Sequence, residues 1–199
     1  TKEDKDRTSL YKNRIIRDNL LKKTYLENGS NDDWMSSLNM RLNIKEINIQ
    51  GPELNRVIQL FNRTNQFHLS GKKYNKTIFQ EILKSKEKSY YAGTLIDNIG
   101  SEGIISVIGF KQKKDIISVE DFILSCRVFG RFIDICMLQP VLEIAQEKNC
   151  SVNFLFHDTG RNKVAKEFIY KSIINKAFIP HENIGKLISK INSVPIKII

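Results

Sequence analysis

The stretch VEDFILSCRVFGRF, residues 119–132, decides the fold class. Its first half is rich in apolar and β-branched residues and predicts a strand. Its second half, RVFGRF at 127–132, places a glycine between two arginines just before a predicted helix. A helix that starts at the end of a strand directs its N-terminal N–H groups at whatever binds there, and an anion suits them. The sequence therefore predicts an α/β domain with a site for a phosphate-bearing ligand at this junction.

Strands and helices are predicted on both sides of the junction. Three consecutive strands between helices favour an antiparallel centre. The strand–helix–strand unit 116–156 favours one parallel pair with a right-handed crossover. Pro140 is expected to kink the helix 131–147. The predicted strands are 38–49, 89–96, 103–110, 116–125, 151–156, 177–179 and 195–199, and the predicted helices are 8–28, a short one around Trp34, 53–67, 76–84, 131–147, 162–174 and 182–191.

This order predicts a mixed, mainly antiparallel sheet flanked by helices. The basic helix 8–28 comes before the first strand, so we expect a helical connector at 1–36 and the sheet domain at 37–199. A length of 199 residues fits one domain with a short appendage.

Composition excludes several protein classes. No apolar run reaches about 18 residues, so no membrane span is expected, and the charged start lacks the apolar region of a secretion signal. Three cysteines without a CxxC and three scattered histidines predict neither disulfides nor a metal site, and a cytoplasmic location is expected.

The net charge of +10 leaves several partners open. Nucleic acid, a membrane surface, an acidic protein and a phosphorylated cofactor all suit a basic chain, and a compositional bias toward lysine gives the same number. No aromatic RNP-like stretch or zinc finger supports nucleic acid as the partner, and no membrane partner is expected.

The 127–132 segment resembles the Gln/Arg-x-x-Gly-x-Gly/Ala loop of GNAT acyltransferases, whose backbone N–H groups hold the pyrophosphate of coenzyme A. Arg127 and Gly130 match the pattern, while Phe132 stands where a small residue is usual. The resemblance implies a GNAT-like fold and a cofactor-binding loop formed by Arg127, Val128, Gly130, Arg131 and Phe132. It also implies that Asn162 begins a second cofactor-facing helix.

A more specific resemblance covers essentially the whole chain. The strings DRTSLY (6–11), TNQFHLS (64–70) and SCRVFGR (125–131), with the pair Thr159 and Asn162, are similar in order and content to the C-terminal region of FkbH-like proteins of HAD subfamily IIIC. The string DKDRT at 4–8 also reads as a HAD nucleophile signature, but with three residues before it and a helix after it we expect it to begin the connector.

The FkbH-like resemblance implies a bacterial acyltransferase of the kind used in polyketide biosynthesis. In that family an upstream HAD phosphatase-like domain precedes the GNAT-like domain, and a glyceryl unit passes through a cysteine thioester to an acyl carrier protein. The implied cofactor is carrier-bound phosphopantetheine or coenzyme A, with no metal in this domain.

Cys126 is the leading catalytic candidate, because a thiolate beside arginines and a helix start is stabilised and nucleophilic. The alternative is a buried structural cysteine. Tyr170 is a candidate general acid, although the resemblance places that tyrosine at position 169, where this chain has Ile169 about 100° around the helix.

The segment 64–70 supplies the predicted substrate-binding residues Asn65, Gln66, Phe67 and His68, joined by Thr159. Their alternative roles are helix termination and core anchoring. Period-2 alternation places Glu120 on the same strand face as Cys126, about 20 Å away, which is too far for proton transfer.

Three functions remain open from the sequence. The first is acyl transfer through Cys126 to a carrier protein. The second is acetyl-CoA-dependent N-acetylation by direct attack of an amine. The third is a non-catalytic module that docks a carrier protein.

Overall fold

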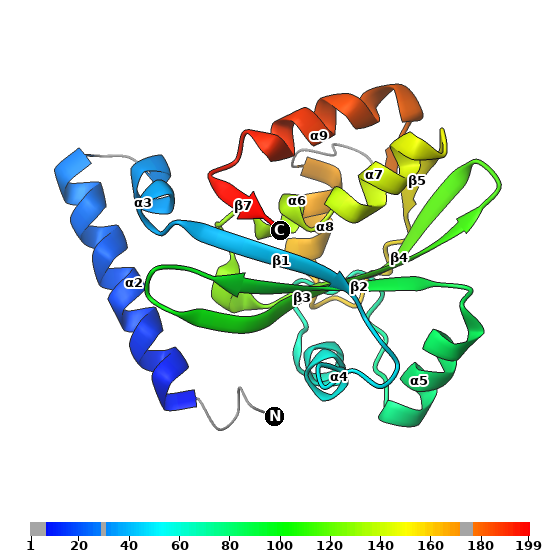
Figure 1. The fold of residues 1–199 in the computed structure, drawn as a ribbon, viewed down its shortest axis with the longest axis horizontal. Coiled ribbons are helices and arrows are strands. Elements are labelled where there is room, and N and C mark those ends of the chain that lie inside the picture. Colours follow the sequence, from blue (N-terminus) through cyan, green and yellow to red (C-terminus); the bar gives the residue numbers. More distant parts are fainter. Residues whose placement is uncertain (1–6, 29–30, 172–176) are drawn as a thin grey trace.

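A computed structural model describes residues 7–28, 31–171 and 177–199, so residues 4–6 of the DKDRT string lie outside the described part. Within it, a mixed sheet lies between helices (Figure 1). Its strands are β1 (Met40–Glu46), β2 (Ser89–Ile96), β3 (Ser101–Lys113), β4 (Ile116–Leu124), β5 (Ser151–Phe154), β6 (Phe178–Ile179) and β7 (Ile196–Ile198). Its helices are α2 (Arg7–Asn28), α3 (Asn31–Ser37), α4 (Leu54–Arg63), α5 (Lys76–Ser85), α6 (Ile133–Cys136), α7 (Gln139–Glu147), α8 (Lys163–Lys171) and α9 (Ile184–Asn192), with 3-10 turns η1 (Cys126–Val128) and η2 (His181–Asn183).

The strand order in space is β6-β5-β4-β3-β2-β1-β7. The four strands β1 to β4 pair antiparallel, whereas β4 with β5 and β1 with β7 pair parallel. The predicted antiparallel centre, the parallel pair and the mixed, mainly antiparallel fold class are confirmed. Short hairpin turns between β2 and β3 and between β3 and β4 explain the antiparallel centre.

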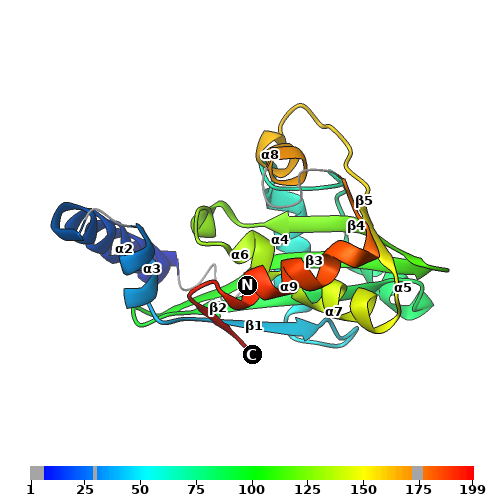
Figure 2. The same cartoon turned by 90° about the horizontal axis from the view of Figure 1, so that it is seen from above.

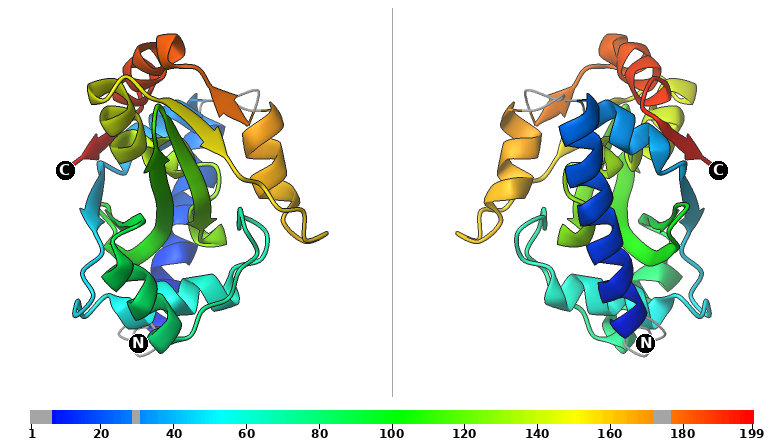
Figure 3. Two further views of the ribbon diagram at one scale, coloured as in Figure 1. Left: turned by 90° about the vertical axis from the view of Figure 1, so that its right-hand side faces the viewer. Right: turned by 90° about the vertical axis from the view of Figure 1, so that its left-hand side faces the viewer.

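Helices cover the two faces of the sheet unequally. On one face α4 and α5 pack over β2, β3 and β4 through an aromatic cluster that includes Phe61, Phe79 and Tyr90. On the other face α6, α7 and α9 form the larger core with residues such as Leu142 and Leu187 (Figures 1 and 3). Cys126 begins η1, two residues after the end of β4 at Leu124.

The predicted connector packs onto the sheet domain. Helix α2 lies at one end of the sheet, and the β2–β3 hairpin reaches it (Figures 1 and 2). Trp34 and Met35 of α3 are buried in the larger core. The predicted boundary between residues 36 and 37 therefore falls inside α3.

The expected helix 131–147 is two helices. Residues 133–136 form α6 and residues 139–147 form α7, so the predicted kink at Pro140 is wrong. Pro140 lies in the first turn of α7, where a missing N–H removes no helical hydrogen bond.

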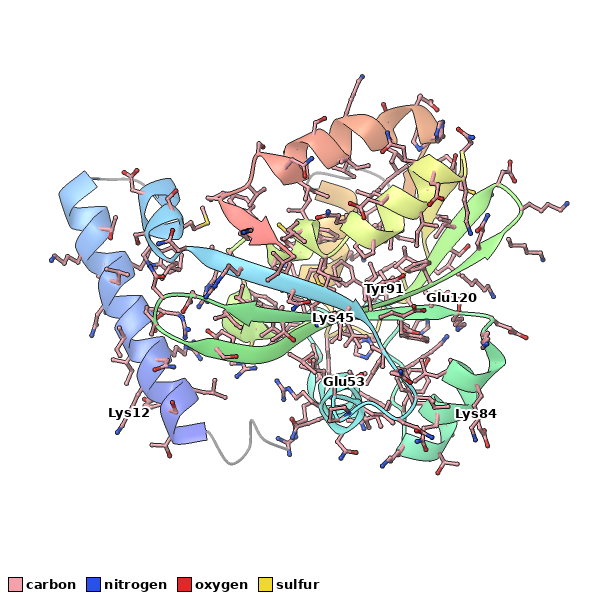
Figure 4. The ribbon with its side chains drawn as sticks, viewed as in Figure 1. Lys12, Lys45, Glu53, Lys84, Tyr91 and Glu120 are labelled. Atoms are coloured by element: carbon pink, nitrogen blue, oxygen red, sulfur yellow. The ribbon has the colours of Figure 1, made fainter. Side chains whose placement is uncertain are left out.

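The expected helix 53–67 ends at Arg63, and the segment after it turns back toward β4. The placement of Glu120 is also corrected. Val119 faces Phe110 and Asp121 faces Gly109, so Glu120 is the extra residue of a β-bulge, which breaks the period-2 alternation. Glu120 (Figure 4) pairs instead with Lys88 at 2.5 Å and Lys111 at 2.8 Å.

Candidate functional site

Cys126 is exposed directly after the end of β4. Ser125 is extended, and the next three residues form η1, with Val128 N–H donating to the Ser125 carbonyl at 3.2 Å. Val128 is fully buried and anchors the turn. The structural alternative for Cys126 does not apply, because its side chain is at the surface, whereas Cys136 and Cys150 are buried.

The Cys126 cleft, of about 470 Å³, lies between η1 and α4. It brings together the predicted residues Cys126, Arg127, Asn65 and Gln66. The remaining lining comes from the α4 surface, the end of β4 and the turn. These residues are Arg56, Gln59, Leu60, Arg63, Thr64, Leu124, Ser125 and Phe129.

Arginines supply the charged side chains among the described residues that line the Cys126 cleft. Three arginines line it, and none of the described lining residues is acidic. Arg56 and Arg63 are seven residues apart on α4, which places them on one face of the helix. Arg56 donates to the Ile104 carbonyl at 3.3 Å and to the Gln59 side chain, so its position is fixed. Sequence analysis missed this pair, although its helical spacing is visible in the sequence.

Arg127 and Arg131 are held by a buried acid. Arg127 donates to the backbone carbonyl of Glu102 at 3.0 Å and to Ser125 Oγ at 3.3 Å. Arg131 is buried, lies 3.3 Å from Glu102 Oε1 and donates to the Arg127 carbonyl at 3.2 Å. Arg131 is absent from the described lining of the Cys126 cleft. Its guanidinium forms an ion pair with Glu102 instead.

The same acid ties α2 to the site. Arg17 is fully buried and lies 2.8 Å from Glu102 and 2.7 Å from Asp97 in the β2–β3 turn. Burial alone would raise the pKa of Asp97, but its hydrogen bonds and ion pair with Arg17 outweigh that and lower it. Sequence analysis gave Arg17 and Glu102 no role, because they are far apart in the sequence.

The strands β4 and β5 separate after Val119 and Phe154, as the predicted ligand site requires. Residues 67–69 of this chain fill the space between them. Leu124 N–H donates to the Phe67 carbonyl at 3.1 Å, Leu69 N–H donates to the Phe122 carbonyl at 2.8 Å, and His157 N–H donates to the Leu69 carbonyl at 3.0 Å. The outer edge of β4 is thereby sealed by backbone hydrogen bonds, with Phe67 buried against Phe122 and Phe168.

The Asn162 side chain holds residues 67–69 in this position. It is buried, and its side-chain amide donates to the carbonyls of His68 at 2.9 Å and His157 at 2.8 Å. Its Oδ1 accepts from Thr159 N–H at 2.9 Å. The motifs 64–70 and 159–162 therefore contact each other.

His68 is enclosed by its own loop. Its Nδ1 accepts from Gly71 N–H at 3.0 Å, so Nε2 carries the proton and donates to the Lys72 carbonyl at 3.0 Å. Burial, with a smaller effect from Lys73, lowers the pKa of His68 and keeps it neutral. Neither His68 nor Phe67 is among the described residues lining the Cys126 cleft.

Tyr170 and Thr159 also lie away from the thiol. Tyr170 lines a different cleft, with Lys72, Glu120 and His157, and packs edge-on against Phe156. Ile169, which stands where the resemblance places the tyrosine, is fully buried. It therefore points in a different direction from Tyr170, the next residue on the helix. Thr159 Oγ1 accepts from Arg161 N–H at 3.3 Å.

The residues present do not fit coenzyme A in the position that the family resemblance implies. Pantetheine would need the outer edge of β4, which residues 67–69 occupy. Phosphates would need the start of α6, where the Asp134 carboxylate accepts from Ile135 N–H at 2.9 Å. Gly130 and Phe132 keep the left-handed turn of the predicted loop, with φ of 75° and 57°, but a carboxylate at its end repels an anion.

Two further searches gave negative results for the described residues. No helix among them is long and apolar enough to cross a membrane. No group of three or more His, Cys, Asp or Glu side chains among them is arranged to hold a metal ion.

Comparisons with known proteins add the following. No protein-family model and no curated protein sequence matches this chain. Among solved structures it is similar to a ribosomal-protein-alanine N-acetyltransferase from Brucella melitensis biovar Abortus 2308 (9% identity, 67% of this chain and 90% of that one, TM-score 0.49). It is also similar to PaiA N-acetyltransferase from Thermoplasma acidophilum in complex with coenzyme A (15%, 65% and 87%, 0.47) and to a GNAT-family acetyltransferase from Staphylococcus aureus Mu50 (14%, 66% and 81%, 0.48). At these values the likeness carries no conclusion about activity, which has to come from the site.

Proposed function

We propose that this chain is an acyltransferase that holds an acyl group as a thioester on Cys126 and passes it to the phosphopantetheine thiol of an acyl carrier protein. One observation carries the proposal: an exposed thiol opens into a cleft that Arg56, Arg63 and Arg127 line together with the amide side chains of Asn65 and Gln66.

The chemistry is two successive acyl transfers. In the first, the Cys126 thiolate attacks the carbonyl of an activated donor such as an acyl phosphate, a C–S bond forms, and phosphate leaves with the electrons of the C–O bond. In the second, the pantetheine thiol attacks the thioester, the bond to Cys126 breaks, and the thiol proton balances the released thiolate. Asn65 and Gln66 line the same cleft, and their amides suit the hydroxyl groups of a glyceryl-like acyl unit.

The net charge of +10 supports an acidic partner. Carrier proteins are commonly acidic, so long-range attraction would speed the encounter and weaken as salt is added. An upstream HAD phosphatase-like domain remains part of this proposal as the source of the acyl donor.

A second candidate is acetyl-CoA-dependent N-acetylation. The separation of β4 from β5 after Val119 favours it, because such a gap is where a pantetheine arm could pair with β4. The sealed edge at Leu124 counts against it.

Intact-mass measurement after incubation with an acyl phosphate or an S-acyl pantetheine tests the proposal. Wild type is expected to gain one acyl mass, peptide mapping is expected to place it on Cys126, and Cys126→Ala is expected to gain none. The matched control Cys150→Ala removes a buried thiol and should acylate as wild type does. An unmodified wild type, or an undiminished adduct on Cys126→Ala, would refute the thioester. Carrier binding that survives Cys126→Ala without chemistry would identify a docking module.

A further inference from the structure

We propose that the outer face of α2 is the docking surface for the carrier protein, and that it holds the carrier beside the turn that bears Cys126. The outer face is the side of α2 that lies opposite the sheet, and it is formed by the exposed residues Tyr11, Lys12, Ile15 and Lys22. The inference rests on the proposed function for the identity of the partner, and it adds where that partner binds.

The first observation is a group of exposed apolar side chains on α2. A helix on the surface of a domain normally turns its polar residues to solvent. In α2 the side chain of Arg17 is fully buried, whereas Ile15, two residues away and about 200° around the helix, is 43% exposed. Tyr11, one turn before Ile15, is 67% exposed, and Ile16 is 51% exposed. Apolar side chains gathered on an outward face favour a contact with another protein.

The second observation is the charge around these side chains. Lys12 and Lys22 are exposed on the same side of the helix as Ile15, and Lys12 points away from the sheet (Figure 4). Asp18, the one acid between the two lysines in the sequence, pairs with Arg14 at 3.9 Å. An apolar centre edged by lysines is complementary to an acidic protein that exposes apolar residues of its own. Carrier proteins are commonly acidic, so the charge of the outer face suits one.

The third observation is the fixed link between α2 and Cys126. Arg17 lies 2.8 Å from the Glu102 carboxylate and donates to the Gly100 carbonyl at 3.1 Å. The Glu102 carbonyl accepts from Arg127, the residue after Cys126, at 3.0 Å. In Figure 2, α2 and the turn that follows β4 lie at the same end of the sheet. A partner bound to α2 is therefore held at a fixed place relative to the thiol.

The position of α2 suits delivery of a thiol on a flexible arm. A carrier protein acts through its phosphopantetheine arm, so it has to dock within the length of that arm from Cys126. One helix diameter, about 10 Å, separates the outer face from the side of α2 that contacts Glu102. The exposed residues Lys113 and Lys114 lie instead at the other end of β4, a strand about 30 Å long. They carry the same charge at a greater distance from the thiol, so they provide a control.

Crosslinking to Cys126 tests the docking surface without requiring catalysis. The probe is an acidic acyl carrier protein whose pantetheine arm ends in a chloroacetamide in place of the thiol. The Cys126 thiolate forms a C–S bond to the methylene carbon, and chloride leaves. The same arm without the carrier protein is the free probe. At equal concentrations the carrier-borne probe should react with wild type about tenfold faster than the free probe, because docking raises the effective concentration of the arm.

Charge-reversed pairs locate the docking surface. Lys12→Glu with Lys22→Glu, and separately Ile15→Ser, should slow the carrier-borne probe about tenfold and leave the rate of the free probe unchanged. Lys113→Glu with Lys114→Glu changes the net charge equally at the far end of β4, and should slow the carrier-borne probe by about twofold or less. Equal slowing by the two charge-reversed pairs, or slowing of the free probe by the α2 variants, would overturn the proposal.

Other occupants of the outer face would give different results. Ile78→Ser removes an isoleucine that is 46% exposed on α5, so it is the control for Ile15→Ser and should crosslink as wild type does. If Ile15→Ser left crosslinking unchanged but abolished self-association in sedimentation, the outer face would belong to a second copy of this chain. If it left crosslinking unchanged but abolished binding to anionic phospholipid vesicles, the outer face would belong to a membrane. Either result would overturn the proposal.

The crosslinking and acylation experiments fail independently. Crosslinking that depends on α2, without a thioester in the acylation experiment, would refute only the proposed function. A thioester on Cys126, with crosslinking that the α2 variants do not slow, would refute only this docking surface.

Discussion

Two groups of arginines flank Cys126, and the structure uses them differently. On one side Arg17 and Arg131 are buried around Glu102. Elsewhere Arg56 and Arg63 of α4 line the Cys126 cleft. The two groups therefore differ in their surroundings: Arg17 and Arg131 are buried around an acid inside the fold, whereas Arg56 and Arg63 lie at the wall of a cleft.

The backbone shows the same division. The outer edge of β4 is sealed by residues 67–69 and by Asn162, whereas the Cys126 cleft opens beside α4. If this comparison is correct, substitutions on the sealed side should reduce stability, and substitutions on the open side should reduce ligand binding with little change in stability.

The largest effect is expected for Arg17→Met. The substitution leaves Asp97 and Glu102 buried without their main cation, and breaking a buried pair in this way costs about 3–5 kcal/mol. Urea unfolding followed by circular dichroism measures the loss. Arg14→Met is the control on the same helix, because its pair with Asp18 is exposed and should contribute under about 1 kcal/mol. Equal losses in the two variants would contradict the structural role of the buried group.

Sequence reasoning could not separate these two groups of arginines. Arg127 and Arg131 lie in the motif, so their charges were expected to serve a ligand and the thiol. Their partner Glu102 is 29 residues away from Arg131 and belongs to a different hairpin, and no local pattern connects them.

The next effect concerns the seal itself. Asn162→Ala should cost about 1–3 kcal/mol, because it leaves the buried His68 carbonyl and the partly buried His157 carbonyl without their donor. Hydrogen exchange at the amides of Leu69 and His157 should accelerate along with it. Asn55→Ala, exposed on α4, serves as the control and should change stability by about 0.5 kcal/mol or less. Fast exchange at Leu69 in the wild type itself would show that the β4 edge is already open.

The seal also marks where sequence reasoning reached its limit. The strand 89–96 was predicted with the bounds that β2 has, because its alternation and flanking turns are local. The pairing of residues 67–69 with β4 was not predicted, because it joins residues more than fifty positions apart and these residues show no strand period of their own.

A smaller effect is expected from pH. The pKa of His68 is lowered in the folded state, so the unfolded state binds a proton first as the pH falls. Stability should therefore decline as the pH drops below about 6.5, by at most about 1.4 kcal/mol per pH unit for one proton. Urea midpoints at several pH values measure the slope, and His68→Gln should flatten it. His157→Gln, at an exposed position, should keep the wild-type slope, and a slope unchanged by His68→Gln would assign the pH effect elsewhere.

The smallest effect on stability is expected on the open side. Arg63 is exposed, so Arg63→Gln should change the free energy of unfolding by about 0.5 kcal/mol or less. The same variant should slow acyl transfer to the carrier protein and reduce the salt dependence of that transfer, because a long-range charge is gone. Urea unfolding and transfer rates at two salt concentrations, measured on one preparation, give both results. A stability loss as large as that of Arg17→Met would show that Arg63 stabilises the fold as the buried arginines do. A wild-type stability with a weaker salt dependence of transfer would show instead that the Arg63 charge attracts the carrier protein.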